Sequence, residues 1–248
     1  MTPKPLNLES VRDYIAEHIG TFHQRRLESL ERLRLHQILR RKNPYLFRAK
    51  NILTAEALIR SILDAHLSSQ EETLFGEFLE GLAIFVCQQT FGGHKSTAEG
   101  IDLEFQREGT YYLVSIKSGP NWGNSSQIQR MKRNFQQAIR RLRQNAGVGT
   151  VVAVNGCAYG RDNHPDKGDY LKLCGQRFWE FISGNERLYL DIIEPLGHQA
   201  KQRNAVFQQA YAQLINRLTR DFLQDFCHAN GLIDWEKLVA FNAAANAR

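Results

Sequence analysis

Residues 100–124, GIDLEFQREGTYYLVSIKSGPNWGN, constrain the fold of this chain more than any other segment. Two runs of strand-forming residues flank a polar turn at residues 107–110, which predicts a β-hairpin. Asp102 begins the first strand, and Ser115 and Lys117 share one face of the second because side chains alternate along a strand. The hairpin therefore brings a carboxylate and an amine together beside a Gly-rich polar loop. This combination suits a metal-dependent phosphodiesterase.

The bulk composition is that of an ordinary soluble globular protein, with 248 residues, 42% hydrophobic and 23% charged. The formal net charge of +6 suits a polyanionic partner such as nucleic acid, although many basic proteins bind none. The four cysteines show neither CxxC pairs nor zinc-ligand spacing, and we expect Cys87 in the core. We find neither a signal peptide nor an apolar run long enough to span a bilayer, so we expect a cytoplasmic protein without a membrane partner.

Hydrophobic periodicity predicts helices before the hairpin. The first forty residues are expected to be largely helical and carry many arginines. Thr54 is expected to cap a helix that ends near His66. Ser69 and Glu72 then form a capping box for a second helix over about residues 70–89.

After the hairpin we expect a basic helix over residues 126–145, capped by Ser125 or Ser126. The further expected elements are a buried strand at 150–154, a polar loop at 155–169, an aromatic helix around 178–181, a possible strand at 188–193, and helices at 199–229 and 235–241. This order predicts one α/β domain with helical additions. Its regions are an N-terminal helical region at 1–68, a catalytic core at 69–194 and a C-terminal helical region at 195–248.

The hairpin residues match the needs of phosphodiester hydrolysis, which requires charge neutralisation at phosphorus and an activated water. A bound Mg²⁺ meets both needs and takes oxygen ligands. Asp102 is the natural first ligand, and Lys117 would position the attacking water or stabilise its deprotonated form. The alternative interpretation is an exposed cross-strand ion pair.

Five segments, LFGEFLE, GGHKSTAEGIDLEF, VSIKSGPNWGNSSQ, VVAVNGCAYG and GQRFWEFISG, extend the pattern over residues 74–194. In this order they resemble the PD-(D/E)xK nuclease superfamily, and most of all its type II restriction endonucleases whose motif is S-x-K. The resemblance implies a restriction-endonuclease-like α/β core, in which helices flank a central mixed β-sheet, with additional N- and C-terminal helices. It also implies Mg²⁺ as the cofactor.

Carried over by position, the resemblance makes Asp102 the first acidic metal ligand and Lys117 the motif lysine. Ser115 stands in place of the second acidic residue, which is the main departure from the pattern. The main-chain carbonyl of Ile116 remains available to the metal. Gly100 stands where the superfamily name has proline, a variable position.

The charge that Ser115 lacks could come from the preceding helix, where the superfamily often has an acidic residue. Glu80 is the first candidate and Glu77 the second. Glu104 is a further candidate because it shares a strand face with Asp102. Each of the helix glutamates could instead be an ordinary solvated residue.

The loop after Lys117 is rich in groups that hydrogen-bond phosphates and base edges. A capped polar loop with a structural Trp122 is the alternative interpretation. The expected DNA contacts are His94, Lys95, Ser96, Ser118, Asn121, Trp122, Asn124, Ser125, Gln127, Arg130 and Arg161. Arg161 is favoured among candidate base readers, which include Asn155, Tyr159, Asp162, Asn163 and His164, because its guanidinium suits guanine in the major groove.

The leading hypothesis is a sequence-specific, Mg²⁺-dependent endonuclease that cleaves double-stranded DNA as a type II restriction enzyme. Cutting both strands of a short target requires two active sites, so we expect a C2 homodimer. A cognate DNA methyltransferase is expected as the genetic neighbour, since the host genome needs protection. The alternatives are a repair or junction nuclease of the same superfamily and a catalytically inert DNA-binding protein.

Overall fold

The computed structural model describes residues 4–145 and 149–245. Contacts divide the chain into two compact units. Unit 1 comprises the residues up to Gly20 together with Phe75–His198, and unit 2 comprises Thr21–Leu74 together with the residues from Gln199 onward. The expectation of one domain with three regions draws different boundaries. That the whole chain folds as one domain stays a prediction.

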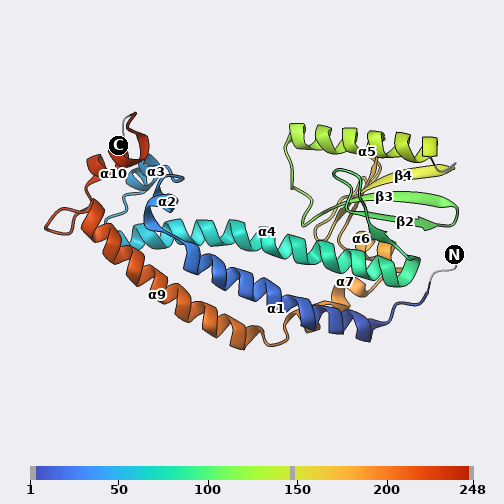
Figure 1. Cartoon of the computed structure of the whole chain (residues 1–248), viewed down its shortest axis with the longest axis horizontal. Helices are drawn as coiled ribbons and strands as arrows, with labels where there is room; N and C mark the ends of the chain where they lie inside the picture. Colours follow the sequence, from blue (N-terminus) through green and yellow to red (C-terminus); the bar gives the residue numbers. More distant parts are fainter. Residues whose placement is uncertain (1–3, 146–148, 246–248) are drawn as a thin grey trace. The chain divides into compact units, whose positions relative to one another are not determined.

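The described part of the chain is mainly helical, with a β-sheet in unit 1 (Figure 1). No helix among the described residues has both the length and the apolar character needed to cross a membrane. The elements are α1 (Leu8–Arg32), α2 (Leu35–Leu39), α3 (Pro44–Ala49), α4 (Ala55–Phe91), β1 (His94–Lys95), β2 (Leu103–Arg107), β3 (Thr110–Lys117), α5 (Ser125–Asn145), β4 (Thr150–Cys157), β5 (Leu171–Cys174), α6 (Gln176–Ser183), α7 (Leu188–Asp191), α8 (Ile193–Leu196), α9 (Ala200–Phe226) and α10 (Trp235–Ala243).

The described strands of unit 1 form one five-stranded sheet in the order β1-β2-β3-β4-β5. β1, β2 and β3 pair antiparallel, whereas β3 pairs parallel with β4, and β4 with β5. A parallel pair needs a long crossover, and α5 provides it between β3 and β4. The α/β class with a central mixed sheet and flanking helices is thus confirmed.

A two-residue turn fixes the β2–β3 hairpin. Arg107 pairs with Thr110, and the residues between them, Glu108 and Gly109, have φ values of 50° and 77°. Positive φ at both central residues is the requirement of a type I′ turn, whose twist matches that of the strands. The expected polar turn at 107–110 is confirmed, and it sets the register of the whole hairpin.

The two faces of the sheet carry different cores. On one face, α5 lies over the strands, as Figure 1 shows, and its Met131 and Phe135 share an apolar core with Leu113 and Ala153. The other face is aromatic: Phe105 of β2 lies 5.6 Å from Phe91 of α4 and 5.3 Å from Phe181 of α6, ring centroid to ring centroid. The sheet is therefore held between helices, and its strand ends stay available for chemistry.

The packing of β4 against α6 leads to a stability prediction at Gly156. A Cβ at Gly156 would lie 2.2 Å from the ring of Phe178, whose side chain is fully buried. Because overpacking a core displaces its neighbours, we expect Gly156→Ala to lower the free energy of unfolding by about 1–3 kcal/mol. Urea unfolding measures it, with Gly149→Ala as the control because nothing lies within 4 Å of that Cβ. Equal midpoints for the two variants would contradict the packing.

Unit 2 has its own apolar core, in which Leu58, Ile62 and Phe222 are almost completely buried. Arg26 lies at the edge of this core, with its guanidinium 3.9 Å from the centre of the Phe207 ring and 2.5 Å from the Glu71 carboxylate. The expected helical additions at both ends of the chain are confirmed.

The expected helix break between His66 and Gln70 is wrong. α4 is continuous from Ala55 to Phe91, and Ser69 lies inside it, where its carbonyl accepts a hydrogen bond from the Thr73 hydroxyl. The capping-box pattern is a local signal, and residues 55–75 contain neither glycine nor proline to stop the helix. The predicted cap at Thr54 is confirmed, since its hydroxyl accepts from the Ala57 N–H at 3.2 Å.

Two further expectations about local structure are wrong, and β5 is a strand that no sequence pattern predicted. The possible strand at 188–193 is the short helix α7, which follows a turn in which the Asn185 side chain accepts from the Arg187 N–H. The residues after the polar loop form a strand, β5, that pairs with β4. The cap of α5 is Asn124 and not Ser125 or Ser126, because the Asn124 side chain accepts from the Gln127 N–H.

Candidate active site

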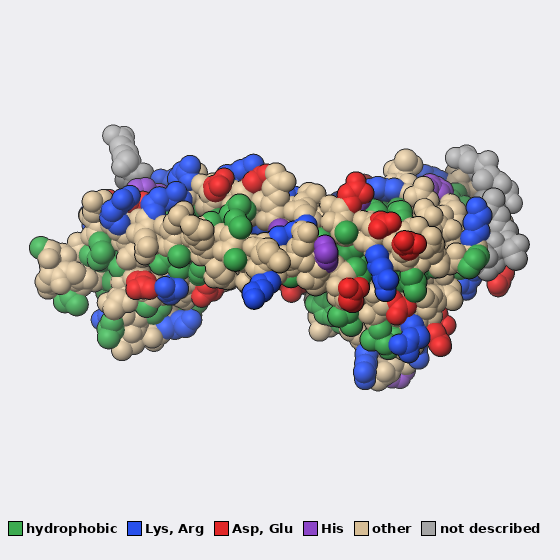
Figure 2. Space-filling view, turned by 90° about the horizontal axis from the view of Figure 1, so that it is seen from below, with side chains coloured by type: hydrophobic (Ala, Val, Ile, Leu, Met, Phe, Trp, Pro, Cys, Tyr) green, Lys and Arg blue, Asp and Glu red, His purple; other side chains and the backbone are tan. Residues whose placement is uncertain are grey.

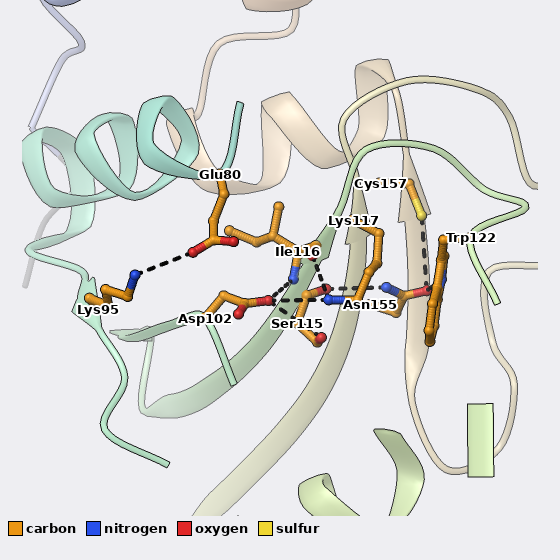
Figure 3. Close-up of polar contacts among 9 residues, drawn as sticks. All are labelled: Glu80, Lys95, Asp102, Ser115, Ile116, Lys117, Trp122, Asn155 and Cys157. Carbon is orange, nitrogen blue, oxygen red and sulfur yellow. Dashed lines mark hydrogen bonds and ion pairs between the residues drawn. The ribbon is translucent and has the colours of Figure 1, made fainter. Parts of the chain in front are cut away.

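The Asp102 carboxylate is held against the end of β3. Its main-chain N–H continues the hairpin ladder to the Val114 carbonyl at 2.9 Å. One carboxylate oxygen, Oδ2, accepts from the Ile116 N–H at 2.6 Å and lies 3.5 Å from the Ser115 hydroxyl (Figure 3). The last β2–β3 pair is Leu103 with Val114, so the Ile116 N–H lies beyond the end of β2 and the carboxylate takes the place of a strand partner.

Lys117 brings an amine to the same carboxylate. Its Nζ lies 3.6 Å from Asp102 Oδ2 and donates to the Ile116 carbonyl at 2.7 Å. Both side chains are mostly buried, with 29% of the lysine and 20% of the aspartate exposed. The hairpin prediction of a juxtaposed carboxylate and amine is confirmed, and the pair is less exposed than a surface ion pair.

Glu80 of α4, the helix that precedes the sheet strands in the chain, points toward this pair (Figure 3). Burial raises the pKa of the Glu80 carboxyl, and the Asp102 carboxylate raises it further, whereas Lys95 and Lys117 act in the opposite direction. Its Oε1 lies 3.5 Å from Lys95 Nζ. Glu77, one turn earlier, is exposed. Between the two helix candidates, the electrostatic coupling of Glu80 to Asp102 therefore favours Glu80.

Glu104 has a structural environment. It is 9% exposed and accepts hydrogen bonds from the hydroxyls of Ser96 and Tyr111, the latter at 2.5 Å. Burial raises the pKa of the Tyr111 hydroxyl, and Glu104 adds to this. With both carboxylate oxygens accepting from hydroxyls, Glu104 anchors residues 96–98 to the sheet, and the geometry gives no support to its role as a metal ligand.

The residues at the strand end fit a divalent cation with hard oxygen ligands. Within residues 4–145 and 149–245, no three side chains of the His, Cys, Asp and Glu types gather as a metal site. Mg²⁺, however, usually takes one or two carboxylates and completes its coordination with waters and substrate phosphates. Asp102 and Glu80 provide two carboxylates, and the Ile116 carbonyl faces the same amine as Asp102. The Asp102 carboxylate raises the pKa of the Glu80 carboxyl, and a cation between the two groups would relieve this repulsion.

The loop after β3 is organised by its own side chains. Asn124 and Gln127 form a reciprocal capping box, since the Gln127 carbonyl Oε1 accepts from the Asn124 N–H at 2.9 Å. Ser118 accepts through its carbonyl from the Tyr159 N–H at 3.1 Å. Asn121 and Ser125 are exposed. The capping groups are therefore structural, and the exposed Asn121 and Ser125 keep their side chains available to a ligand.

The remaining candidate DNA contacts divide in the same way. His94 and Lys95 on β1 are exposed, as is Arg161, whereas the Ser96 hydroxyl is engaged with Glu104. Arg130 at the start of α5 is exposed and pairs with Glu99 at 2.7 Å.

The candidate base readers in the loop after β4 also differ in accessibility. Asn155 is 1% exposed and Asp162 binds Lys167 at 3.0 Å, so both have structural roles. Tyr159, Asn163 and His164 are exposed.

The charge of α5 is entirely basic, because the chain has no Asp or Glu between Glu108 and Asp162. The face of the molecule in Figure 2 has acidic and basic side chains interspersed. The basic charge of α5, unlike that mixed face, suits the phosphate backbone of a nucleic acid.

Sequence reasoning missed one contact of the site. Trp122 Nε1 donates to the buried side chain of Asn155 at 3.1 Å, and the Trp122 ring centre lies 5.5 Å from Lys117 Nζ. The partners come from a loop and from β4. Only the parallel pairing of β3 with β4 brings them together, so no local pattern could have indicated the contact.

A central mixed sheet with a carboxylate and a lysine at the end of one hairpin is the arrangement expected of a nuclease of the type II restriction endonuclease class. The chain matches the family model of type II restriction endonuclease EcoO109I over residues 9–204, which is most of its length, and it therefore belongs to that family. Members of this class are site-specific deoxyribonucleases that hydrolyse phosphodiester bonds, so the chain is a DNA-binding hydrolase, and metal dependence is general in the class. A comparison with curated proteins found no match.

Proposed function

We propose that this endonuclease cleaves double-stranded DNA at a specific sequence in a Mg²⁺-dependent reaction. The observation that carries the proposal is the placement of the Asp102 carboxylate, the Lys117 amine and the Glu80 carboxyl at one end of the β2–β3 hairpin. Asp102 and Glu80 would hold the cation, together with the Ile116 carbonyl. When bound, Mg²⁺ supplies positive charge that neutralises the phosphate and makes a nearby water easier to deprotonate.

The chain's own residues would do the remaining work. Lys117 Nζ, a strong donor beside Asp102, would orient the attacking water and stabilise the negative charge that develops on it. Because the amine is largely shielded from solvent, this charge interaction is stronger than the same interaction at the surface. The main-chain N–H of Ile116 keeps the Asp102 carboxylate oriented while the reaction proceeds.

DNA recognition would use the exposed polar groups around this site. The basic face of α5, including Arg130, would contact the phosphate backbone together with His94, Lys95 and Ser125. Arg161 remains the favoured base reader. Two copies related by a twofold axis would place one site on each strand of a palindromic target. In the cell we expect a cytoplasmic enzyme with a cognate methyltransferase encoded beside it.

The test is digestion of plasmid and phage DNA by the purified protein in Mg²⁺, with EDTA as the control. Discrete fragments with common ends support the proposal. A smear indicates a nuclease without sequence specificity, such as a repair or junction enzyme. DNA that stays intact in Mg²⁺ would contradict the proposal. Sedimentation of the protein with and without the cleaved duplex tests the twofold assembly.

A second prediction separates the contributions of Ser115 and Glu80. The Ser115 hydroxyl brings no charge and lies 3.5 Å from Asp102, so Ser115→Ala is expected to retain partial activity. Glu80→Ala removes a carboxylate coupled to Asp102 and is expected to cost more and to raise the Mg²⁺ concentration needed. Single-turnover cleavage across a Mg²⁺ titration measures both, with the exposed Glu72→Ala as the control. If Glu80→Ala has a normal Mg²⁺ requirement, Glu77 becomes the candidate ligand.

A further inference from the structure

Lys117 needs a device that holds its amine in place. A lysine side chain has four methylene groups joined by rotatable bonds, and restricting their rotation costs conformational entropy. The Ile116 carbonyl and Asp102 restrain the amine from one direction. In Figure 3 the Lys117 amine lies between the Asp102 carboxylate and the Trp122 ring, whose centre is 5.5 Å from Nζ. This distance is within the range of a cation–π interaction.

The Trp122 ring is itself fixed by a buried amide. Asn155 is 1% exposed, accepts from Trp122 Nε1 at 3.1 Å and donates from Nδ2 to the Ser115 carbonyl at 3.1 Å. An indole N–H can only donate and a carbonyl can only accept, so the two bonds together admit one orientation of the amide. The pairing of Ser115 with Asn155 in the parallel β3–β4 ladder places the amide beside the catalytic strand.

We propose that Trp122 and Asn155 are positioning residues for Lys117: the Asn155 amide ties the Trp122 ring to β3, and the ring face keeps the Lys117 amine beside Asp102. This inference rests on the proposed function, since it gives a role to the proposed catalytic lysine. It differs from the expectation that Trp122 contacts DNA, because a positioning residue affects the chemical step and not the affinity for DNA.

Cleavage kinetics test the role of the ring. We expect Trp122→Leu to lower the single-turnover rate at saturating enzyme by about 10–100-fold, since small displacements of catalytic groups have effects of this size. The Kd for DNA without Mg²⁺ should be unchanged. Trp122→Phe, which keeps a ring face and loses the N–H, should recover part of the rate. A wild-type rate for Trp122→Leu, or a weaker Kd with an unchanged rate, would overturn the inference.

Tyr170→Leu is the matched control. Tyr170 packs against the same cluster of apolar residues as Trp122, and its ring centre lies 5.9 Å from the amine of Lys132. This variant therefore removes an aromatic ring and a lysine–ring pair from the same core. We expect it to keep the wild-type single-turnover rate. An equal loss of rate in both variants would show that the effect is only a loss of core packing.

Coupling between Trp122 and Asn155 tests the role of the amide. Asn155→Ala should lower the rate, and its effect should be smaller in a Trp122→Phe background, where the indole N–H is already absent. Fully additive effects would show that Asn155 does not act through Trp122. Thermal unfolding of each variant checks that the folded fraction at the assay temperature matches the wild type.

A spectroscopic experiment keeps the inference testable apart from the proposed function. The chain has three tryptophans, and Trp122→Phe identifies the Trp122 indole N–H resonance in an NMR spectrum of the metal-free protein. Asn155→Ala and Lys117→Met should both move this resonance, and Lys132→Met should not. If neither of the first two substitutions moves it, the inference is wrong even where the wild type cleaves DNA. If both move it and the wild type leaves DNA intact, the arrangement holds and the proposed function fails.

Discussion

Asp102→Ala is expected to abolish DNA cleavage while specific binding to DNA survives. The variant removes the carboxylate that contacts both Lys117 and the end of β3, and with it the proposed first metal ligand. Binding should persist and could tighten, because a negative charge near the phosphate is lost. Single-turnover cleavage in Mg²⁺ and gel-shift titration in its absence measure the two effects.

Asp102→Asn is the control that separates charge from structure. Asparagine keeps an oxygen that can accept from the Ile116 N–H, so the hairpin end should stay ordered, but it removes the negative charge. We expect it to be as inactive as the alanine variant, with a melting temperature closer to the wild type. Cleavage near the wild-type rate by either variant would refute the assignment of the whole site.

Lys117→Ala is expected to lower the cleavage rate by several orders of magnitude, and Lys117→Arg should not restore it. Guanidinium is bulkier than an ammonium group and far harder to deprotonate. It also has to fit between the Ile116 carbonyl and the Trp122 ring. Rapid-quench kinetics at saturating Mg²⁺ give the rates. Full activity of the Lys117→Arg variant would leave Lys117 only a general electrostatic role. Lys132→Arg on α5 serves as the matched control.

The hairpin was predictable from sequence because its determinants are local. Strand alternation places Ser115 and Lys117 on one face, and the short turn sets the register that brings Asp102 beside them. The position of Glu80 next to Asp102 could not be predicted from local patterns, because it depends on how α4 lies against the sheet. The resemblance to a nuclease family supplied that information in the form of a candidate pair, Glu80 and Glu77, and the coupling of Glu80 to Asp102 favours the first.

The errors share a physical cause, which is that local signals compete with tertiary structure. Ser69 carries a cap pattern, yet no helix breaker accompanies it, so α4 continues. β5 has only four residues and becomes a strand by pairing with β4. The link between Trp122 and Asn155 joins a loop to a strand that lies beyond an intervening helix. This link depends on the parallel register of β3 and β4, which single-sequence patterns do not specify.

The two-residue turn at Glu108 and Gly109 limits how this enzyme can change in evolution. Because the side-chain period of a strand is two, a slip of the β2–β3 pairing by one residue would turn Asp102 to the opposite face of the sheet, away from Lys117. A substitution that tolerates positive φ at the tip leaves the register intact. We therefore expect exchanges at the tip that keep positive φ to preserve the site, and any change that slips the register to separate Asp102 from Lys117.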